Sequence, residues 1–126
     1  MLLTYDRLDV SELRGTSVAD YLVSVQADFR VVDNDRCVFE ELAFPVVELA
    51  RALLQWVNDP QRVDFEFDSM SFEERGAVRV RSSARGWILG TVFEAADACT
   101  PADWPDVERS IRAFTAKVAA DLSAPR

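Results

Sequence analysis

The stretch that decides the fold is residues 44–59, which read FPVVELARALLQWVND. Pro45 suits the first turn of a helix, because the N–H that proline lacks has no partner there. Four polar positions share one narrow stripe: Glu48, Arg51, Gln55 and Asn58. Nearly every other position is apolar, and residues 58–60 (Asn-Asp-Pro) stop the helix. The stretch therefore predicts a helix that is buried over most of its surface.

The residues before this helix predict a β-hairpin. Residues 18–32 alternate apolar and polar side chains, and a period of two is typical of a half-buried strand. The Asp-Asn-Asp run at residues 33–35 favours a turn. Residues 36–42 then return as the second strand of the hairpin. Residues 2–5 are a candidate for a short edge strand.

Three further strands and a second helix follow along the chain. Strand patterns cover residues 62–69, 76–83 and 86–94, with turn residues in both connections. Residues 103–122 carry apolar side chains at spacings of three and four, which is the period of an amphipathic helix. The order β-β-α-β-β-β-α predicts a single α+β domain over residues 1–126. We expect an antiparallel sheet of about five strands with two helices packed on one face.

The chain has 126 residues and a formal net charge of −8. This charge argues against nucleic acid as a partner, because phosphate binding needs clustered Lys and Arg, and against an anionic membrane surface. It is compatible with solubility alone, or with a basic protein partner whose association it would accelerate. The first residues lack the basic segment of a signal peptide, and no apolar run approaches the ~18 residues that span a bilayer. We expect a cytoplasmic protein.

The chain contains no histidine. This absence excludes nucleophilic systems that use histidine as the base and zinc sites with histidine ligands. The two cysteines, Cys37 and Cys99, are too few for a disulfide framework, and no histidine is available to generate a reactive thiolate. No glycine-rich phosphate loop is present. We therefore expect a protein that is not an enzyme, with no catalytic residues, no metal site and no cofactor.

Residues 63–69 read VDFEFDS and form the strongest candidate for charged chemistry. Alternate residues of a strand lie about 6.5–7 Å apart on one face, so Asp64, Glu66 and Asp68 form an acidic ladder. Two neighbouring carboxylates could coordinate Mg²⁺ or Ca²⁺, which prefer oxygen ligands. Acid–base chemistry would need one carboxyl group whose pKa is raised by burial.

The next strand favours a different interpretation of the ladder. A turn centred on residues 73–74 sets Asp68 opposite Arg79 and Glu66 opposite Arg81. Cross-strand pairs of opposite charge contribute about 0.2–1 kcal/mol each, and an arginine beside a carboxylate competes with a bound cation. We therefore expect a solvated ladder paired with arginine. A partner-binding face is the first alternative, and a metal or catalytic site is the second.

Two further features indicate possible contacts with another protein. Residues 69–76 form the hairpin tip, where Phe72 stands beside the acidic residues Glu73 and Glu74, a combination that suits a basic partner. Trp104, in the first turn of the last helix, is a candidate interface anchor. The alternative for both aromatic side chains is packing against the core.

The order of three segments resembles a group of small uncharacterised bacterial domains: FPVVELARALLQWV, then FEFDS, then GWILGTVFE. It is also similar to small α+β immunity proteins of bacterial polymorphic toxin systems. The resemblance covers residues 20–122. It implies a short, acidic, cytosolic protein without catalytic motifs.

These observations lead to one expected function and one alternative. The expected function is a non-enzymatic binding protein, namely an immunity-type inhibitor or another acidic protein-interaction domain. Its candidate partner-binding residues are Asp64, Glu66, Phe72, Glu73, Glu74 and Trp104. The alternative is a small-molecule-binding or regulatory domain, with a pocket between the sheet and the helix at residues 45–58.

Overall fold

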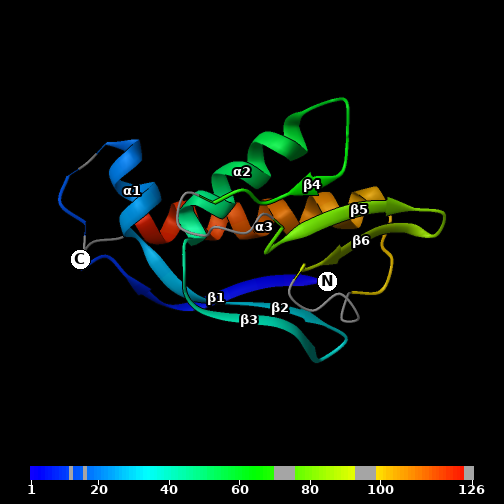
Figure 1. Cartoon of the computed structure of the whole chain (residues 1–126), viewed down its shortest axis with the longest axis horizontal. Coiled ribbons are helices and arrows are strands. Elements are labelled where there is room, and N and C mark those ends of the chain that lie inside the picture. Colours follow the sequence, from blue (N-terminus) through cyan, green and yellow to red (C-terminus); the bar gives the residue numbers. More distant parts are fainter. Residues whose placement is uncertain (12, 16, 70–75, 93–98, 124–126) are drawn as a thin grey trace.

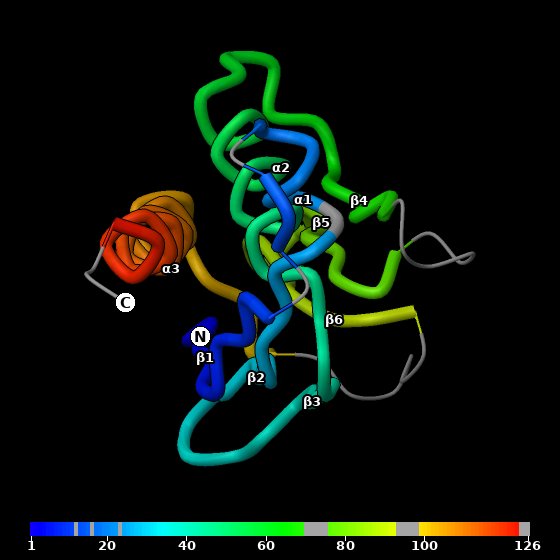
Figure 2. Tube along the Cα trace, turned by 90° about the vertical axis from the view of Figure 1, so that its left-hand side faces the viewer, coloured from blue at the N-terminus to red at the C-terminus, as the bar shows by residue number. Residues whose placement is uncertain are grey.

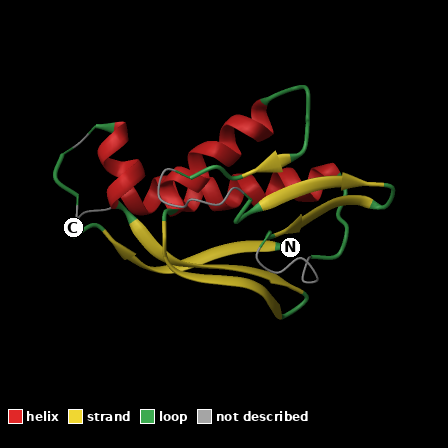
Figure 3. Cartoon of the chain, viewed as in Figure 1, coloured by secondary structure: helices red, strands yellow, loops and turns green. Residues whose placement is uncertain are grey.

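The computed structural model describes residues 1–11, 13–15, 17–69, 76–92 and 99–123. These residues form an α+β fold with two antiparallel sheets and three helices (Figures 1 and 3). The elements follow the chain as β1 (Leu2–Asp9), α1 (Val18–Ser24), β2 (Gln26–Asp33), β3 (Arg36–Phe44), α2 (Val46–Asn58), β4 (Phe65–Glu66), β5 (Arg79–Ser83), β6 (Gly86–Gly90) and α3 (Trp104–Ser123). None of the helices in these ranges is both long and apolar enough to cross a membrane.

Helix α2 forms where its sequence predicts it, and it is surrounded by other elements. It packs against α3, α1 and β2, and its Trp56 ring lies 5.6 Å from the ring of Phe65, the first residue of β4. The side chains of Val46, Leu49 and Leu53 are 0% exposed. A helix that is apolar around most of its circumference therefore has neighbours on several sides, as its sequence requires.

The first sheet has the strand order β1-β2-β3, and α2 and α3 lie on the same side of it (Figure 2). Alternate residues of β2 point into the core, and Phe29 packs against Phe114 of α3 with ring centroids 5.8 Å apart. The predicted hairpin of β2 and β3 is confirmed. Its turn residues Asn34 and Asp35 both have positive φ, the conformation of the tight two-residue turns that suit twisted hairpins.

The predicted strand over residues 18–32 is wrong in its first half, because residues 18–24 form helix α1. Ser17 caps this helix: its hydroxyl accepts from the backbone N–H of Asp20, whose carboxylate accepts from the N–H of Ser17. This reciprocal pair satisfies N–H groups that a helix start leaves free. The capped helix therefore forms in spite of the alternating pattern. Strand-like burial begins only after it, at Val25.

The predicted single sheet of about five strands is also wrong, because β4, β5 and β6 form a second sheet. The predicted order omitted α1 and treated β1 as a short optional strand. One sheet face covers only one side of a helix, whereas α2 is apolar around most of its surface. A second sheet meets that need, and Phe44 at the end of β3 joins the two sheets through its contact with Phe67, 5.7 Å away.

All three tryptophans meet at the end of the molecule where α2 ends and α3 begins. The rings of Trp56, Trp87 and Trp104 lie 5.4–5.6 Å apart. A backbone bridge holds this tryptophan cluster together, because Trp87 and Ala102 exchange two N–H···O bonds of 2.8 and 2.9 Å. The bridge brings the start of α3 against the outer edge of β6.

The bridge predicts that Gly86→Ala will destabilise the protein by about 1–3 kcal/mol. Gly86 has a φ of +128°, and a Cβ atom there would lie 2.7 Å from the carbonyl oxygen of Ala102. Urea unfolding measures the effect. The neighbouring control Arg85→Ala, on an exposed turn side chain, should cost less than about 0.5 kcal/mol. Equal costs for the two variants would contradict the prediction.

Asp33 ties the β2–β3 turn to the segment that precedes α3. Its carboxylate accepts from the backbone N–H of Thr100 at 2.8 Å and from the Thr100 hydroxyl at 3.1 Å, and the amino group of Met1 lies 3.5 Å away. Burial raises the pKa of this carboxyl group. The hydrogen bonds from Thr100 and the nearby amino group outweigh burial, so the pKa lies below its ordinary value.

A lowered folded-state pKa stabilises the protein above the unfolded-state pKa, near 3.9, and this stabilisation is lost as pH falls through the folded-state pKa. Asp33→Asn should therefore lower Tm by about 3–6 °C at neutral pH. The difference from the wild type should shrink as both proteins are melted at successively lower pH below 4. A difference that does not change with pH would show that the charge of Asp33 contributes nothing.

Candidate functional site

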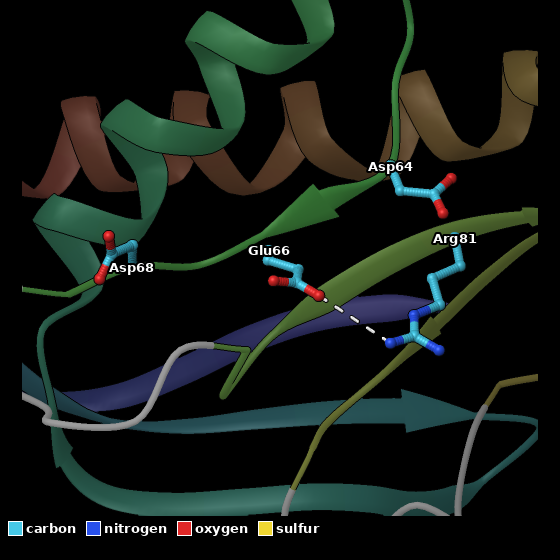
Figure 4. A pocket seen from close by; sticks show the side chains of 4 residues that line it. All are labelled: Asp64, Glu66, Asp68 and Arg81. Atoms are coloured by element: carbon cyan, nitrogen blue, oxygen red, sulfur yellow. Dashed lines mark ion pairs between the residues drawn. The ribbon is translucent and has the colours of Figure 1, made fainter.

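Among the residues that the structure describes, three carboxylates and one guanidinium group line an open hollow of about 570 Å³ on the outer face of the second sheet (Figure 4). We call this hollow the acidic trough, and its lining residues are Asp64, Glu66, Asp68 and Arg81. The trough contains the acidic ladder expected from the sequence. All four lining side chains are exposed, so the trough is accessible to another molecule.

The alternation of the strand explains why the carboxylates face outwards. Phe65 and Phe67 are buried, and successive side chains of a strand point to opposite faces. Burial of the two rings therefore turns the residues on either side of them, Asp64, Glu66 and Asp68, to the outer face. The hydrophobic core thus holds the acidic trough in place, although the carboxylates are themselves in water.

The predicted cross-strand partners are wrong by two residues. Glu66 lies opposite Arg79 rather than Arg81, and Asp68 is not set opposite Arg79. The turn centre assumed from the sequence, residues 73–74, therefore does not describe the pairing. The pairing is also irregular beside Gly76, which has a φ of +93°. Phe67 donates its N–H to Val78 but accepts from the N–H of Gly76, so the second strand carries extra residues that a symmetric hairpin lacks.

A shift of two residues changes the partners but leaves every side chain on its own face. The acidic face is therefore confirmed although its register is not. Arg81 still reaches Glu66 diagonally, with Nη2 and Oε1 3.9 Å apart, and the two side chains are 49% and 45% exposed. An exposed ion pair at this distance contributes little to stability.

Asp64 has a partner that the sequence did not predict. Its Oδ1 accepts from the backbone N–H of Ser82 at 2.9 Å and from the Ser82 hydroxyl at 3.2 Å. The carboxylate therefore closes the end of the trough as a fixed group. The only hint in the sequence was a serine in the run RSSARG, and serine side chains make such local contacts in many different settings.

The described part of the chain contains no group of three His, Cys, Asp or Glu side chains close enough to hold a metal ion. Arg81 also places a positive charge inside the trough, where it competes with any bound cation. The geometry therefore suits larger cationic groups that approach from solvent better than it suits a coordinated metal.

The other predicted partner-binding residues fall into two groups. Phe72, Glu73 and Glu74 lie outside the described residues, so their role at the hairpin tip stays a prediction. Trp104 begins α3, is half-buried, and contacts both other tryptophans. It therefore packs within the tryptophan cluster, while the guanidinium of Arg62 lies 4.4 Å from its ring centroid.

The tryptophan cluster and the acidic trough are joined through one short segment. The indole N–H of Trp56 donates to the carbonyl of Val63 at 2.6 Å. Val63 lies between Arg62, which covers Trp104, and Asp64, which lines the trough. Sequence reasoning did not identify Arg62, because a lone arginine after a helix has no distinguishing pattern.

Two other sites considered from the sequence, the Cys99 thiol and the space between the first sheet and α2, are poorly suited to catalysis and to ligand binding. Burial, with a smaller contribution from Asp33, raises the pKa of the Cys99 thiol to about 11, so this cysteine is not a ready nucleophile. The space between the first sheet and α2, where a small-molecule pocket was the alternative, is occupied by the fully buried side chains of Phe29, Leu49 and Leu53.

Comparison with known proteins finds a family model that matches the chain. A family model described as "Domain of unknown function (DUF7878)" matches residues 1–124. No curated protein and no solved structure matches the chain.

The trough geometry predicts that Asp64 contributes more to stability than Glu66, although of these two it is Glu66 that has the arginine partner. Asp64→Ala should cost about 0.5–1.5 kcal/mol, because it removes the acceptor for Ser82. A double-mutant cycle of Glu66→Ala and Arg81→Ala should give a coupling energy below about 0.5 kcal/mol. Urea unfolding measures both quantities. A coupling energy larger than the cost of Asp64→Ala would refute this ranking.

Proposed function

The chain belongs to the DUF7878 family, and we propose that it is a non-enzymatic binding protein that covers a basic surface of another protein. The observation that carries this proposal is the acidic trough. Among the described residues, the three exposed carboxylates share this face with two guanidinium groups, those of Arg79 and Arg81. The local charge is therefore negative, like that of the whole chain. Complementary charge accelerates association and disfavours acidic competitors.

The construction of the trough supports binding rather than catalysis. Its carboxylates are exposed, and Asp64 and Glu66 already interact with Ser82 and Arg81. General acid–base chemistry in proteins usually depends on a group whose surroundings shift its proton affinity. A surface for a protein partner needs only accessible charge, held in a fixed arrangement by the elements beneath it.

We further propose that this binding is inhibitory, as in the immunity proteins of polymorphic toxin systems. An immunity-type inhibitor acts by covering the working surface of its target, so it needs no reactive group of its own. Nucleases and other proteins that act on anionic substrates carry basic surfaces. An acidic trough presented on a sheet complements such a surface without conformational change.

The experiment that tests this proposal compares the proteins captured by two variants that carry the same net charge. Glu66→Gln with Asp68→Asn neutralises the trough, whereas Asp6→Asn with Glu40→Gln neutralises two exposed carboxylates beside Arg30 on the first sheet. Both variants change the net charge equally. A partner captured from the native cell by the wild type and by the control, and lost by the trough variant, supports the proposal.

The captured partner is then purified and titrated calorimetrically against all three proteins over a series of salt concentrations. The trough variant should bind at least about tenfold more weakly than the control, a loss of about 1.4 kcal/mol, and its affinity should depend less on salt. Thermal melting confirms that both variants are folded. Equal affinity of the two variants for every partner would overturn the proposal.

A further inference from the structure

The segment between α2 and β4 carries an arginine in a costly position. Arg62 has a φ of +50°, in the left-handed region that residues with a side chain seldom adopt. The backbone nevertheless holds this conformation, and the guanidinium lies over the ring of Trp104, 4.4 Å from its centroid. Trp104 also keeps a buried indole N–H that has no hydrogen-bond partner in the described structure. Such unfavourable features concentrate at functional sites.

Arg62 lies over an aromatic ring although carboxylates are close to it in sequence. Asp59 and Asp64 flank it, but their Oδ1 atoms accept from the backbone N–H groups of Gln61 and Ser82. Within the described ranges, Arg62 makes no ion pair with either carboxylate. Its guanidinium contacts the electron-rich face of Trp104, a cation–π interaction.

The surroundings of this ring face favour a positive charge. The flanking carboxylates lower the electrostatic energy of a cation there, and the indole face attracts it further. Arg62, which covers this face, is two residues along the chain from Asp64, which lines the trough. A basic partner that enters the trough would therefore bring its cationic side chains to the edge of Trp104.

We propose that Arg62 is an intrinsic plug, which covers Trp104 in the free protein and gives way to an arginine or lysine side chain of the partner. This inference rests on the proposed function, since it identifies a second contact for the same basic partner. The exchange conserves the cation–π interaction, because one cation replaces another on the ring. It also frees Arg62, which is already exposed, from the ring and allows its backbone to leave the left-handed region.

The plug is tested with a hexa-arginine peptide as the probe. The peptide is titrated against the wild type, Arg62→Ala and Arg85→Ala, with tryptophan fluorescence as the readout. Both variants lose one positive charge, but Arg85 lies in the exposed turn between β5 and β6 and covers no ring in the described structure. Removing the plug should lower the Kd roughly two- to fivefold relative to Arg85→Ala. Arg62→Lys, which keeps a cation on the ring, should bind like the wild type.

Two outcomes separate the plug from the proposed function. If Glu66→Gln with Asp68→Asn weakens peptide binding while Arg62→Ala and Arg85→Ala bind equally, the plug is wrong and the trough proposal stands. If the trough variant binds the peptide as tightly as Asp6→Asn with Glu40→Gln, the trough does not select cations. Arg62→Gln keeps much of the side-chain length without the charge, and it replaces Arg62→Ala if that variant does not fold.

Discussion

The apolar circumference of α2 is the constraint on which the rest of the structure depends. Each fully buried side chain of this helix contributes about 1.5–3 kcal/mol relative to its exposed form. Most of its circumference is therefore kept from water, and the exposed positions are Arg51, Leu54, Gln55 and Asn58. One sheet and one helix cannot enclose such a cylinder. The protein encloses it with two sheets and two further helices, and the contacts of Phe44 with Phe67 and of Trp56 with Phe65 join these layers.

The acidic trough is a consequence of this enclosure. The second sheet covers α2 with Phe65 and Phe67, and the alternation of the strand then exposes the intervening carboxylates on the opposite face. The trough is thus as rigid as the core behind it. The proposed partner-binding surface needs no rearrangement for its main contacts, and the residue proposed to move is Arg62, two residues before Asp64 of the trough.

The tryptophan cluster connects stability with the proposed recognition. Trp56 and Trp87 hold the ends of α2 and β6 together, and Trp104 adds the start of α3. The same cluster presents one ring face to Arg62 and fixes the carbonyl of Val63 beside the trough. Substitutions in this cluster will therefore affect folding and binding together, which is why the proposed tests change Arg62 and the carboxylates instead of the rings.

The sequence by itself determined the α+β class, the extent of α2, the β2–β3 hairpin and the face on which Asp64, Glu66 and Asp68 lie. All of these follow from local periods, turn residues and apolar patterning, which act over a few residues. The helix at residues 18–24 was set by a local capping pair, Ser17 and Asp20, which the alternating pattern obscured. Tertiary structure alone decided the split into two sheets, the partners of the acidic ladder and the position of Arg62 on Trp104. Each of these depends on how segments that are distant in the sequence pair or pack. A periodic pattern cannot report such features, because the competing arrangements place the same residues on the same faces.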